Sequence, residues 1–290
     1  MLWLTAATAA EQRVLVMGRL SDDPGGYIGR LQPLLDYVVA DLADFGVERG
    51  QVIMARDANQ MASYIRQEKV DWVGDTAAVA LLLIDRSDAV PLAMVAKHGS
   101  TRYRTVLFAR RDSGIANIAD LAGKTIAFQN SNSTSAYYLP AGMLLDAGLR
   151  PAILVSPLEK PAPGVVGYAF SRLEANSAAW VHKRVVDAAA VSDQDWEDTA
   201  RVPDSFRKDL RVFAESPAVP RGVELVRPGL DPALRDRILQ RLLGAPESEA
   251  GRKALSEYFR TERFVVPDRE DLDDLYALRP WLRRVREEVE

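Results

Sequence analysis

The stretch TIAFQNSNSTSAYYLPAGMLLDAGL, residues 125–149, joins a short apolar strand, a loop of small polar residues and an apolar helical run. Five small polar residues in a row, 131–135, stand directly before the helical run. One of them is enough for an N-cap, because one hydroxyl satisfies one unpaired N–H group. Several hydroxyls with unpaired N–H groups at the positive end of a helix dipole can also hold an anion. The stretch therefore has two interpretations, a helix cap or an anion site.

The chain before this stretch alternates between strand-like and helix-like segments. Short apolar runs predict strands at 13–18, 51–55, 70–74 and 91–97. Apolar residues at helical spacing predict helices between them, at 31–46 and 59–69. Near-continuous apolar strands that alternate with helices are typical of a parallel α/β sheet.

The same pattern begins again in the second half of the chain. A strand that leads into a turn is predicted at 105–114, and further strands are predicted at 125–128, 153–156, 165–170, 185–192, 211–216 and 223–229. A helix is predicted at about 172–184, and the remainder of the chain is helical. No low-complexity linker separates the halves, so we expect the chain to cross between them through strands. The helical tail is then expected to return to the first half.

Composition limits the partners that the chain can have. Its 290 residues carry a formal charge of −4, and the basic residues are scattered, which argues against nucleic acid as a partner. An anion must therefore be bound at a local site and not by net charge. The sequence has no cysteine, which excludes thiolate catalysis, zinc–cysteine sites and disulfides.

The sequence contains no constellation of residues that predicts an enzyme. Neither a G-x-G-x-x-G fingerprint nor a Walker loop is present. Neither His98 nor His182 lies beside a strand-to-helix turn that could carry a nucleophile. The paired carboxylates Asp22-Asp23 and Asp273-Asp274 fall in a turn and on a terminal helix. We therefore expect neither catalysis nor a cofactor or metal.

The first ten residues, MLWLTAATAA, are apolar and then small. The A-x-A pattern at residues 7–9 matches a signal-peptidase site. We interpret residues 1–10 as the end of an export signal whose start is missing, with a simple N-terminal extension as the alternative. The first interpretation predicts a periplasmic protein.

The chemistry of the opening stretch suits an oxyanion. A helix that starts after a strand lies where open α/β sheets bind ligands, outside the carboxyl ends of the strands. Ser133, Thr134 and Ser135 add neutral hydroxyl donors to the backbone N–H groups there. Pro140 deletes an intrahelical hydrogen bond five residues later, so the first turn must be short, kinked or supported from elsewhere.

The segment 121–149 resembles the signature of the PhnD-like substrate-binding proteins of phosphate, phosphite and phosphonate ABC transporters. In that family a strand ending in Ala-Phe leads to an S-T-S-x-x-x-x-P helix, and the likeness here runs from about Val14 to about Tyr276. It implies a type II periplasmic-binding-protein fold, in which two α/β lobes with mainly parallel sheets are joined by two crossing strands. We expect lobe 1 at 11–106 plus 213–290 and lobe 2 at 107–212, with the ligand enclosed between them by a hinge motion.

The resemblance also implies ligand-binding residues. In the family, the hydroxyls and N–H groups of the S-T-S turn bind the phosphorus oxyanion, which assigns Ser133, Thr134 and Ser135. Positions that approach the ligand in the family correspond here to Asp75, Thr76, Tyr103, Ser192 and Asp193. For Tyr103 the alternative is a surface aromatic, and for Ser192 and Asp193 it is a helix N-cap. An acid at 193 would accept a proton from a monoprotonated oxyanion or pair with an amine.

One position departs from the family. Many phosphonate binders carry a histidine near residues 171–174, where this chain has Arg172 and Glu174. Arg172 either supplies a guanidinium to the oxyanion or lies in solvent. The departure leaves the identity of the anion open.

The function implied is that of a monomeric, non-enzymatic periplasmic protein that captures a small phosphorus oxyanion (phosphonate, phosphite or phosphate). It would deliver this anion to an ABC permease in the inner membrane. Two alternatives remain: a ligand-sensing module that serves a membrane sensor kinase, and a binder of a sulfonate-type or other organic anion.

Overall fold

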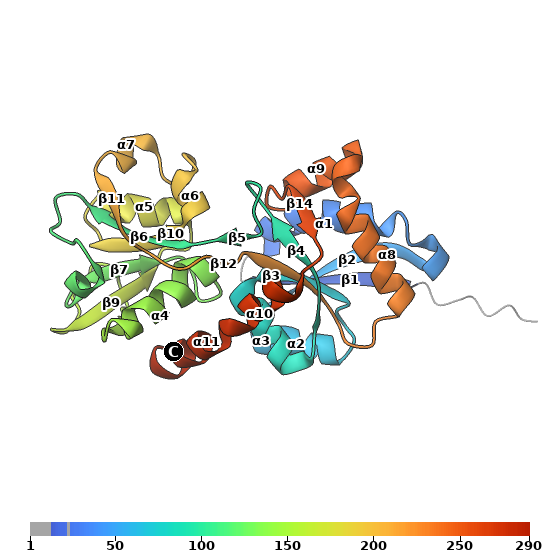
Figure 1. Cartoon of the computed structure of the whole chain (residues 1–290), viewed down its shortest axis with the longest axis horizontal. Helices are drawn as coiled ribbons and strands as arrows, with labels where there is room; N and C mark the ends of the chain where they lie inside the picture. The colour runs from blue at the N-terminus through green and yellow to red at the C-terminus, as the bar shows by residue number, and fades with distance from the viewer. Residues whose placement is uncertain (1–12, 22–23) are drawn as a thin grey trace, which may run out of the picture. The chain divides into compact units, whose positions relative to one another are not determined.

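The computed structural model describes residues 13–21 and 24–290, and these residues form two compact α/β units (Figure 1). Unit 1 comprises the chain up to Asp75 together with Leu83–Lys97 and Glu224–Val266. Unit 2 comprises Thr76–Leu82, His98–Val223 and Pro267–Glu290. The export signal predicted at residues 1–10 lies outside the described residues.

The sheet of unit 1 has six strands in the order β14-β4-β13-β3-β1-β2. Its strands are β1 (Arg13–Leu20), β2 (Val47–Ala55), β3 (Trp72–Thr76), β4 (Val90–Ala96), β13 (Gly222–Val226) and β14 (Arg263–Val265). The strand β1 pairs in parallel with β2 and β3, whereas β14 pairs antiparallel with β4. The predicted α/β class is thus confirmed for this unit.

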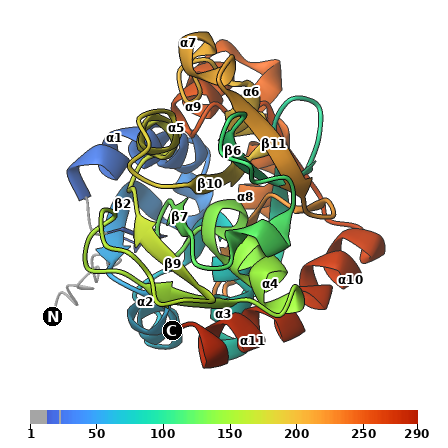
Figure 2. The same ribbon diagram turned by 90° about the vertical axis from the view of Figure 1, so that its left-hand side faces the viewer.

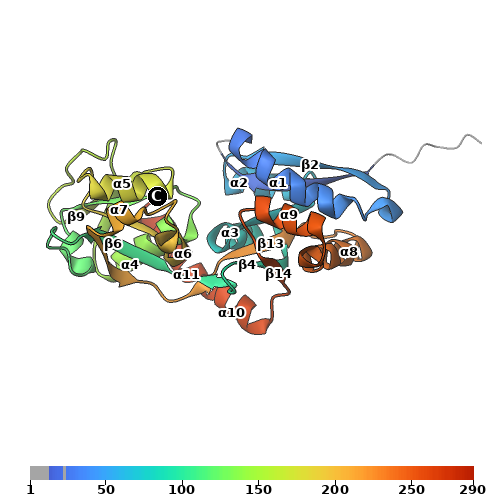
Figure 3. The ribbon, with the colours of Figure 1, turned by 90° about the horizontal axis from the view of Figure 1, so that it is seen from above.

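Helices pack on both faces of this sheet. The helices α1 (Pro24–Val39), α8 (Pro232–Leu243) and α9 (Glu249–Glu257) lie side by side on one face (Figure 3). They share an apolar core with Leu15 and Met17 of β1. Gly18 faces the other side of the sheet, where Met61 of α2 (Ala58–Arg66) packs so closely that a Cβ at Gly18 would be 2.7 Å from its sulfur.

The sheet of unit 2 also has six strands, in the order β11-β6-β10-β7-β9-β8. Its strands are β6 (Thr105–Arg110), β7 (Thr125–Phe128), β8 (Arg150–Ile153), β9 (Val165–Phe170), β10 (Ala188–Ser192) and β11 (Leu210–Glu215). The strands β10, β7, β9 and β8 are parallel, and β6 runs antiparallel to both β10 and β11. A two-stranded ribbon joins β5 (Arg102–Tyr103) to β12 (Val219–Pro220).

The longer helices of the sheet in unit 2 connect its parallel strands. The helix α4 (Leu139–Asp146) covers one face of the sheet and α5 (Glu174–His182) the other (Figure 2). The short helices α6 (Asp193–Glu197) and α7 (Asp204–Arg207) connect β10 to β11. The helix α3 (Ala77–Ser87) is divided between the units, with its first six residues in unit 2. Among the helices in the described part of the chain, none combines the length and apolar character that a bilayer crossing needs.

One predicted strand is displaced. The apolar run 153–156 is not a strand of its own, because β8 ends at Ile153. Since β8 is the last strand of its sheet, it has a neighbour on one side only, and the chain then leaves the sheet. Ile153 is 63% exposed and Val155 is fully exposed, so these apolar residues do not mark a buried strand.

The position of the helical tail differs from the predicted division of the chain. The helices α10 (Arg269–Ala277) and α11 (Arg279–Glu288) belong to unit 2, not to the first half of the chain. Arg284 of α11 forms an ion pair of 2.6 Å with Asp146 of α4. Trp281 packs over Gly142, where a Cβ would lie 3.2 Å from the indole ring. The tail is therefore held by apolar packing and ion pairs within unit 2.

Replacing Trp281 should loosen this tail. We expect Trp281→Ala to lower the free energy of unfolding by about 2 kcal/mol, less than the loss for a fully buried Trp, because Trp281 is half-buried. Urea denaturation measures this change. Arg283→Ala, on the exposed face of the same helix, should change it by less than about 0.5 kcal/mol. Equal effects of the two substitutions would show that the tail is not held by Trp281.

Candidate anion-binding site

The topology of unit 2 brings the predicted turn to one edge of its sheet. From β7 the chain passes through α4 to β8 on one side of the sheet, whereas from β10 it passes through α6 and α7 to β11 on the other side. The crossovers therefore diverge at the ends of β7 and β10, and ligands bind at such switch points. Ser133–Ser135 follow β7 at this edge, Ser192 ends β10, and Asp193 is the next residue.

The turn after β7 is wider than an ordinary helical turn. Ser133 is its N-cap, with Oγ accepting a 3.1 Å hydrogen bond from Ala136 N. Tyr138 N donates to Ser133 O, five residues back, which makes residues 134–138 a π-helical turn. Turns of this kind are often found at functional sites.

Pro140 explains why the turn is wide. In an α-helix the N–H group of residue 140 would bond to Ala136 O, but proline has none. Gln129 N donates to Ala136 O instead, over 3.0 Å. Of the predicted alternatives, a short turn, a kinked turn or a turn supported from elsewhere, the kink at Ala136 and the outside support both apply, because Gln129, the residue after β7, supplies the missing donor.

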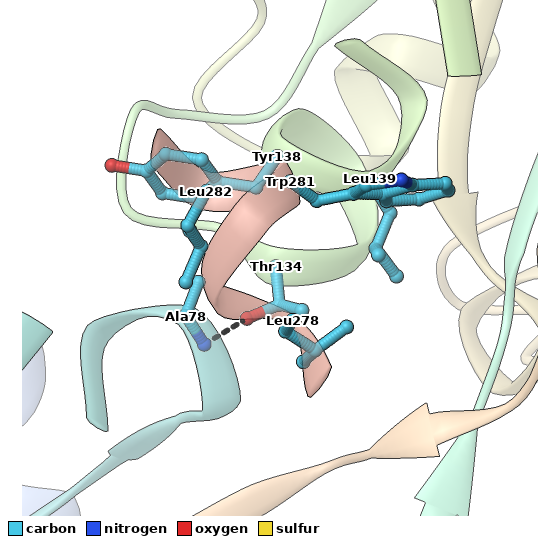
Figure 4. A pocket seen from close by; sticks show the side chains of 7 residues that line it. All are labelled: Ala78, Thr134, Tyr138, Leu139, Leu278, Trp281 and Leu282. Atoms are coloured by element: carbon cyan, nitrogen blue, oxygen red, sulfur yellow. Dashed lines mark hydrogen bonds between the residues drawn. The ribbon is translucent and has the colours of Figure 1, made fainter. Parts of the chain in front are cut away.

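The hydroxyls of Ser133 and Thr134 and the backbone carbonyl of Ser135 have roles in the fold. Thr134 Oγ1 accepts a 2.9 Å hydrogen bond from Ala78 N, at the start of α3 (Figure 4). Thr105 Oγ1 donates to the carbonyl oxygen of Ser135 over 2.7 Å. Ser133 and Thr134 act here as acceptors, and a hydroxyl that accepts still has its proton to donate. The cap interpretation is therefore right for Ser133, yet it leaves the donor capacity of the turn intact.

Tyr103 faces this turn. Its side chain is buried, at 5% exposure, and within the described residues its hydroxyl makes no well-formed hydrogen bond. Burial raises the pKa of Tyr103, whereas Arg221 and the side chains of Ser135 and Thr134 lower it, so these groups lie beside it. The phenol is neutral and buried without a proper acceptor. Such a group is costly unless a water molecule, a neighbouring hydroxyl or a ligand supplies the acceptor.

The other predicted residues of this edge are placed as follows. Ser192 is the N-cap of α6, since its Oγ accepts from Asp195 N over 3.0 Å. Asp193 Oδ1 accepts from the backbone of Arg104 (3.2 Å) and of Gln194 (2.9 Å). The N-cap alternative therefore applies to Ser192. Asp193 is tied to the residue that follows Tyr103.

Arg172 and Thr76 also belong to unit 2. Arg172 is exposed, has a positive φ of 71°, and donates its N–H group to Gln129 O over 2.9 Å. Thr76 Oγ1 donates to Asn132 O over 3.2 Å. Both residues thus contact the loop between β7 and the π-helical turn.

Sequence reasoning missed Arg221, which follows β12. Its guanidinium lies 5.0 Å from the centre of the Tyr103 ring, and Nη1 donates to Gln194 Oε1. It also missed Glu174, whose carboxylate accepts from Gln129 Nε2 (2.6 Å) and Arg201 Nη1 (3.2 Å). Burial and Asp195 raise the pKa of Glu174, and Arg201 lowers it. Neither residue belongs to a motif, and only the fold brings them to this edge.

The hollow at the base of the turn is not the ligand site. It has a volume of about 10 Å³, room for about one water molecule, and its lining is mainly apolar (Figure 4). Its lining residues are Ala78, Thr134, Tyr138, Leu139, Leu278, Trp281 and Leu282. It is the place where the tail and the start of α3 meet the turn.

The bond between Thr134 and Ala78 should be measurable as stability. Thr134→Val keeps the shape of the side chain but leaves the buried Ala78 N–H without its acceptor. We expect the free energy of unfolding to fall by about 1–3 kcal/mol. Thr134→Ser keeps the acceptor and should be much less destabilised in the same urea titration. If Thr134→Val and Thr134→Ser lower the free energy of unfolding equally, loss of this hydrogen bond is not the cause of the destabilisation.

Asp75, the remaining predicted residue, belongs to unit 1 and lies in a buried polar cluster. Its Oδ2 is 3.6 Å from Arg19 Nη1, and the same nitrogen donates to Gly74 O. The rings of Tyr27 and Phe259 lie 5.6 and 4.9 Å from the Arg19 guanidinium. The guanidinium of Arg19 is thus shared between a carboxylate, a carbonyl and two aromatic faces.

Glu224 completes this cluster. It is fully buried, and its oxygens accept from Trp72 Nε1 and from the Tyr258 hydroxyl, both over 2.7 Å. Burial raises the pKa of Glu224 to about 7, although both hydrogen bonds and Arg19 favour the charged form. Gly74 is required beside it, because a Cβ there would lie 2.3 Å from the carboxylate.

Glu224 should make the stability of the protein depend on pH. Since the folded state binds this proton more tightly than the unfolded state, stability falls as the pH rises from 4.5 to about 7 and levels off above it. The raised pKa corresponds to a fall of about 3 kcal/mol. Unfolding measured at about pH 5 and about pH 8 should show this difference in the wild type and lose it in Glu224→Gln. Identical slopes for the two proteins would contradict the buried, proton-binding state.

A unit that gathers neutral donors at the switch point of a parallel sheet has the features of a small-ligand-binding protein. A family profile described as "ABC transporter, phosphonate, periplasmic substrate-binding protein" matches residues 20–272. The chain belongs to this family, which supplies the substrate-binding component of ABC transporters and not an enzyme.

Solved structures share the fold of this chain. The protein XAC2383 from Xanthomonas citri, bound to chloride ion, is 42% identical, with a TM-score of 0.88 over 94% of this chain and 99% of that chain. A second structure of XAC2383 is bound to ATP, with 41% identity and a TM-score of 0.88 over 96% and 99% of the two chains. PhnD1 from Prochlorococcus marinus (MIT 9301), in complex with methylphosphonate, shares the fold at 16% identity, with a TM-score of 0.71 over 95% and 99%.

A curated relative has a different role. The tetrathionate sensor histidine kinase TtrS of Salmonella typhimurium is 28% identical over 207 residues, which are 67% of this chain. The match covers 34% of TtrS, so the chain spans about a third of that relative's length.

Proposed function

We propose that this chain is a periplasmic receptor that captures a small phosphorus oxyanion (phosphonate, phosphite or phosphate) and delivers it to an ABC permease. The observation that carries the proposal is the buried Tyr103 hydroxyl, which has no well-formed hydrogen bond and lies beside Ser135 and Thr134. An anion oxygen at this place would complete the hydrogen bonding of the phenol and receive the protons of the turn.

The donor set favours a tetrahedral oxyanion. Ser133, Thr134, Ser135 and Tyr103 are all neutral donors, and they come from two elements of unit 2. Neutral hydroxyl donors to an ionised acceptor make short, strong hydrogen bonds without a counter-charge of their own. Membership in a phosphonate-binding family favours phosphorus as the central atom.

The remaining predicted residues stay part of this proposal with particular roles. Asp193 and Asp75 are proposed as acceptors, for a proton of the ligand or for an amine on its substituent. Thr76, Arg172 and Ser192 are proposed as further contacts, because Thr76 and Ser192 end β3 and β10 and Arg172 lies in the loop that follows β9.

A titration of the purified protein tests the proposal. The panel contains phosphate, phosphite, methylphosphonate, aminoethylphosphonate, sulfate, taurine and ATP. A ligand at about 100 times its Kd stabilises the folded state by about 2.7 kcal/mol, which a thermal-shift assay detects. We expect one phosphorus oxyanion to give the largest shift. Ser135→Ala should weaken its binding about 10- to 100-fold, by loss of one hydrogen bond to a charged group.

Ser131→Ala is the matched control for this titration. Ser131 belongs to the same polar run but is exposed and precedes the turn, so its loss should change the affinity less than about twofold. No shift with any phosphorus oxyanion would overturn the proposal. A dominant response to sulfate or taurine would support the sulfonate alternative. A dominant response to ATP, the ligand of the XAC2383 complex, would assign a nucleotide to this chain.

The second candidate is a ligand-sensing module that serves a membrane sensor kinase. The similarity to part of TtrS favours it, and the same ligand-binding chemistry would serve either output. The two functions differ in the partner of the ligand-bound protein. Stimulation of a reconstituted permease by the loaded protein would support transport. Binding to a kinase ectodomain without such stimulation would support sensing.

A further inference from the structure

We infer that Arg221 supplies the positive charge of the anion site and gives the site its preference for doubly charged oxyanions. The inference rests on the proposed function and deepens it, because the predicted hydroxyl donors are all neutral.

Arg221 is placed by the short ribbon of unit 2. It follows β12, which pairs with β5 so that Val219 faces Tyr103, and its own N–H group donates to Thr101 O over 2.9 Å. The backbone of Arg221 is thus fixed to the strand that carries Tyr103. The Arg221 guanidinium lies over the Tyr103 ring, 5.0 Å from its centre. Its positive charge lowers the pKa of the Tyr103 hydroxyl.

The side chain of Arg221 has no carboxylate partner within the described residues. Its polar contact is the neutral amide oxygen of Gln194, and its other contact is the Tyr103 ring. Two other half-buried arginines have carboxylate partners, Arg201 with Glu174 at 3.2 Å and Arg227 with Asp71 at 2.9 Å, whereas Arg211 donates to the backbone oxygen of Ile115. A half-buried guanidinium beside neutral groups has lost hydration without gaining a counter-ion, and a bound anion would supply one.

The charges around Arg221 leave it available for an anion. Arg221 lowers the pKa of Glu174, yet Glu174 is bound directly by Arg201 and Gln129. Asp195 influences both Tyr103 and Glu174, and it accepts a 2.6 Å hydrogen bond from Ser192 Oγ. Both acids are therefore occupied by other donors.

The chemistry of guanidinium explains the expected preference. Arginine presents five N–H donors in a planar fork, and a contact to Gln194 through Nη1 leaves the others for an oxyanion. A fixed positive charge attracts a dianion more strongly than a monoanion, whereas neutral hydroxyls discriminate less. The affinity of the site should therefore rise as the ligand loses its second proton.

The test compares Arg221→Gln, Arg221→Lys and the matched control Arg211→Gln. Arg211 is also a half-buried arginine of unit 2 without an ion pair in the described residues, but it pairs with Ala109 at the opposite edge of the sheet. Calorimetric titration with methylphosphonate, phosphite and phosphate is performed on either side of each ligand's second ionisation, at low and high salt, with sulfate as a reference that is doubly charged at both pH values.

We expect Arg221→Gln to weaken binding of the preferred anion about 10- to 100-fold, as for loss of one hydrogen bond to a charged group. It should also reduce the preference for the dianion and the salt dependence of binding, which loss of structure alone would not do. Arg221→Lys should restore part of the affinity, and Arg211→Gln should bind like the wild type.

The outcomes separate this inference from the proposed function. If the wild type binds a phosphorus oxyanion and Arg221→Gln binds it equally well with an unchanged dianion preference, the inference is wrong and the proposed function stands. If Arg211→Gln weakens binding as much as Arg221→Gln, the role of Arg221 is structural and the inference is also wrong. If the wild type binds none of the four anions, both fall.

Discussion

The hydrogen bond from Gln129 N to Ala136 O is the contact on which the geometry of the site depends. Pro140 cannot donate to Ala136 O, and the end of β7 replaces the missing donor. The turn is thereby held wide, so that Ser133 caps it, Thr134 reaches the start of α3 and Ser135 lies beside Tyr103. A proline that is unfavourable for an ordinary helix thus fixes three hydroxyls at the carboxyl edge of a parallel sheet.

Much of this arrangement could be predicted from local sequence. The alternation of apolar strands and helices predicts two α/β units, and the S-T-S-x-x-x-x-P pattern predicts both the turn and the family. The position of the tail could not be predicted in this way. Its place in unit 2 depends on Trp281 meeting Gly142, a fit between two residues far apart in the sequence that no periodicity records.

The charged residues Arg221 and Glu224 could not be predicted from the sequence either. Arg221 follows a two-residue strand and belongs to no motif, and only the pairing of β12 with β5 brings it over Tyr103. The burial of Glu224 beside Gly74, Trp72 and Tyr258 likewise results from packing across unit 1. Sequence patterns predict which elements form, whereas the charge environment depends on which elements become neighbours.

The most direct measurement is a comparison of wild type with Tyr103→Phe, in which unfolding without ligand and anion affinity are measured on the same samples. If the buried hydroxyl awaits a ligand, its removal relieves a cost in the empty protein and removes a donor from the complex. The account predicts that Tyr103→Phe is as stable as the wild type or more so, by up to about 1 kcal/mol, and binds the anion at least about tenfold more weakly. A variant that loses stability but keeps the affinity of the wild type would contradict it.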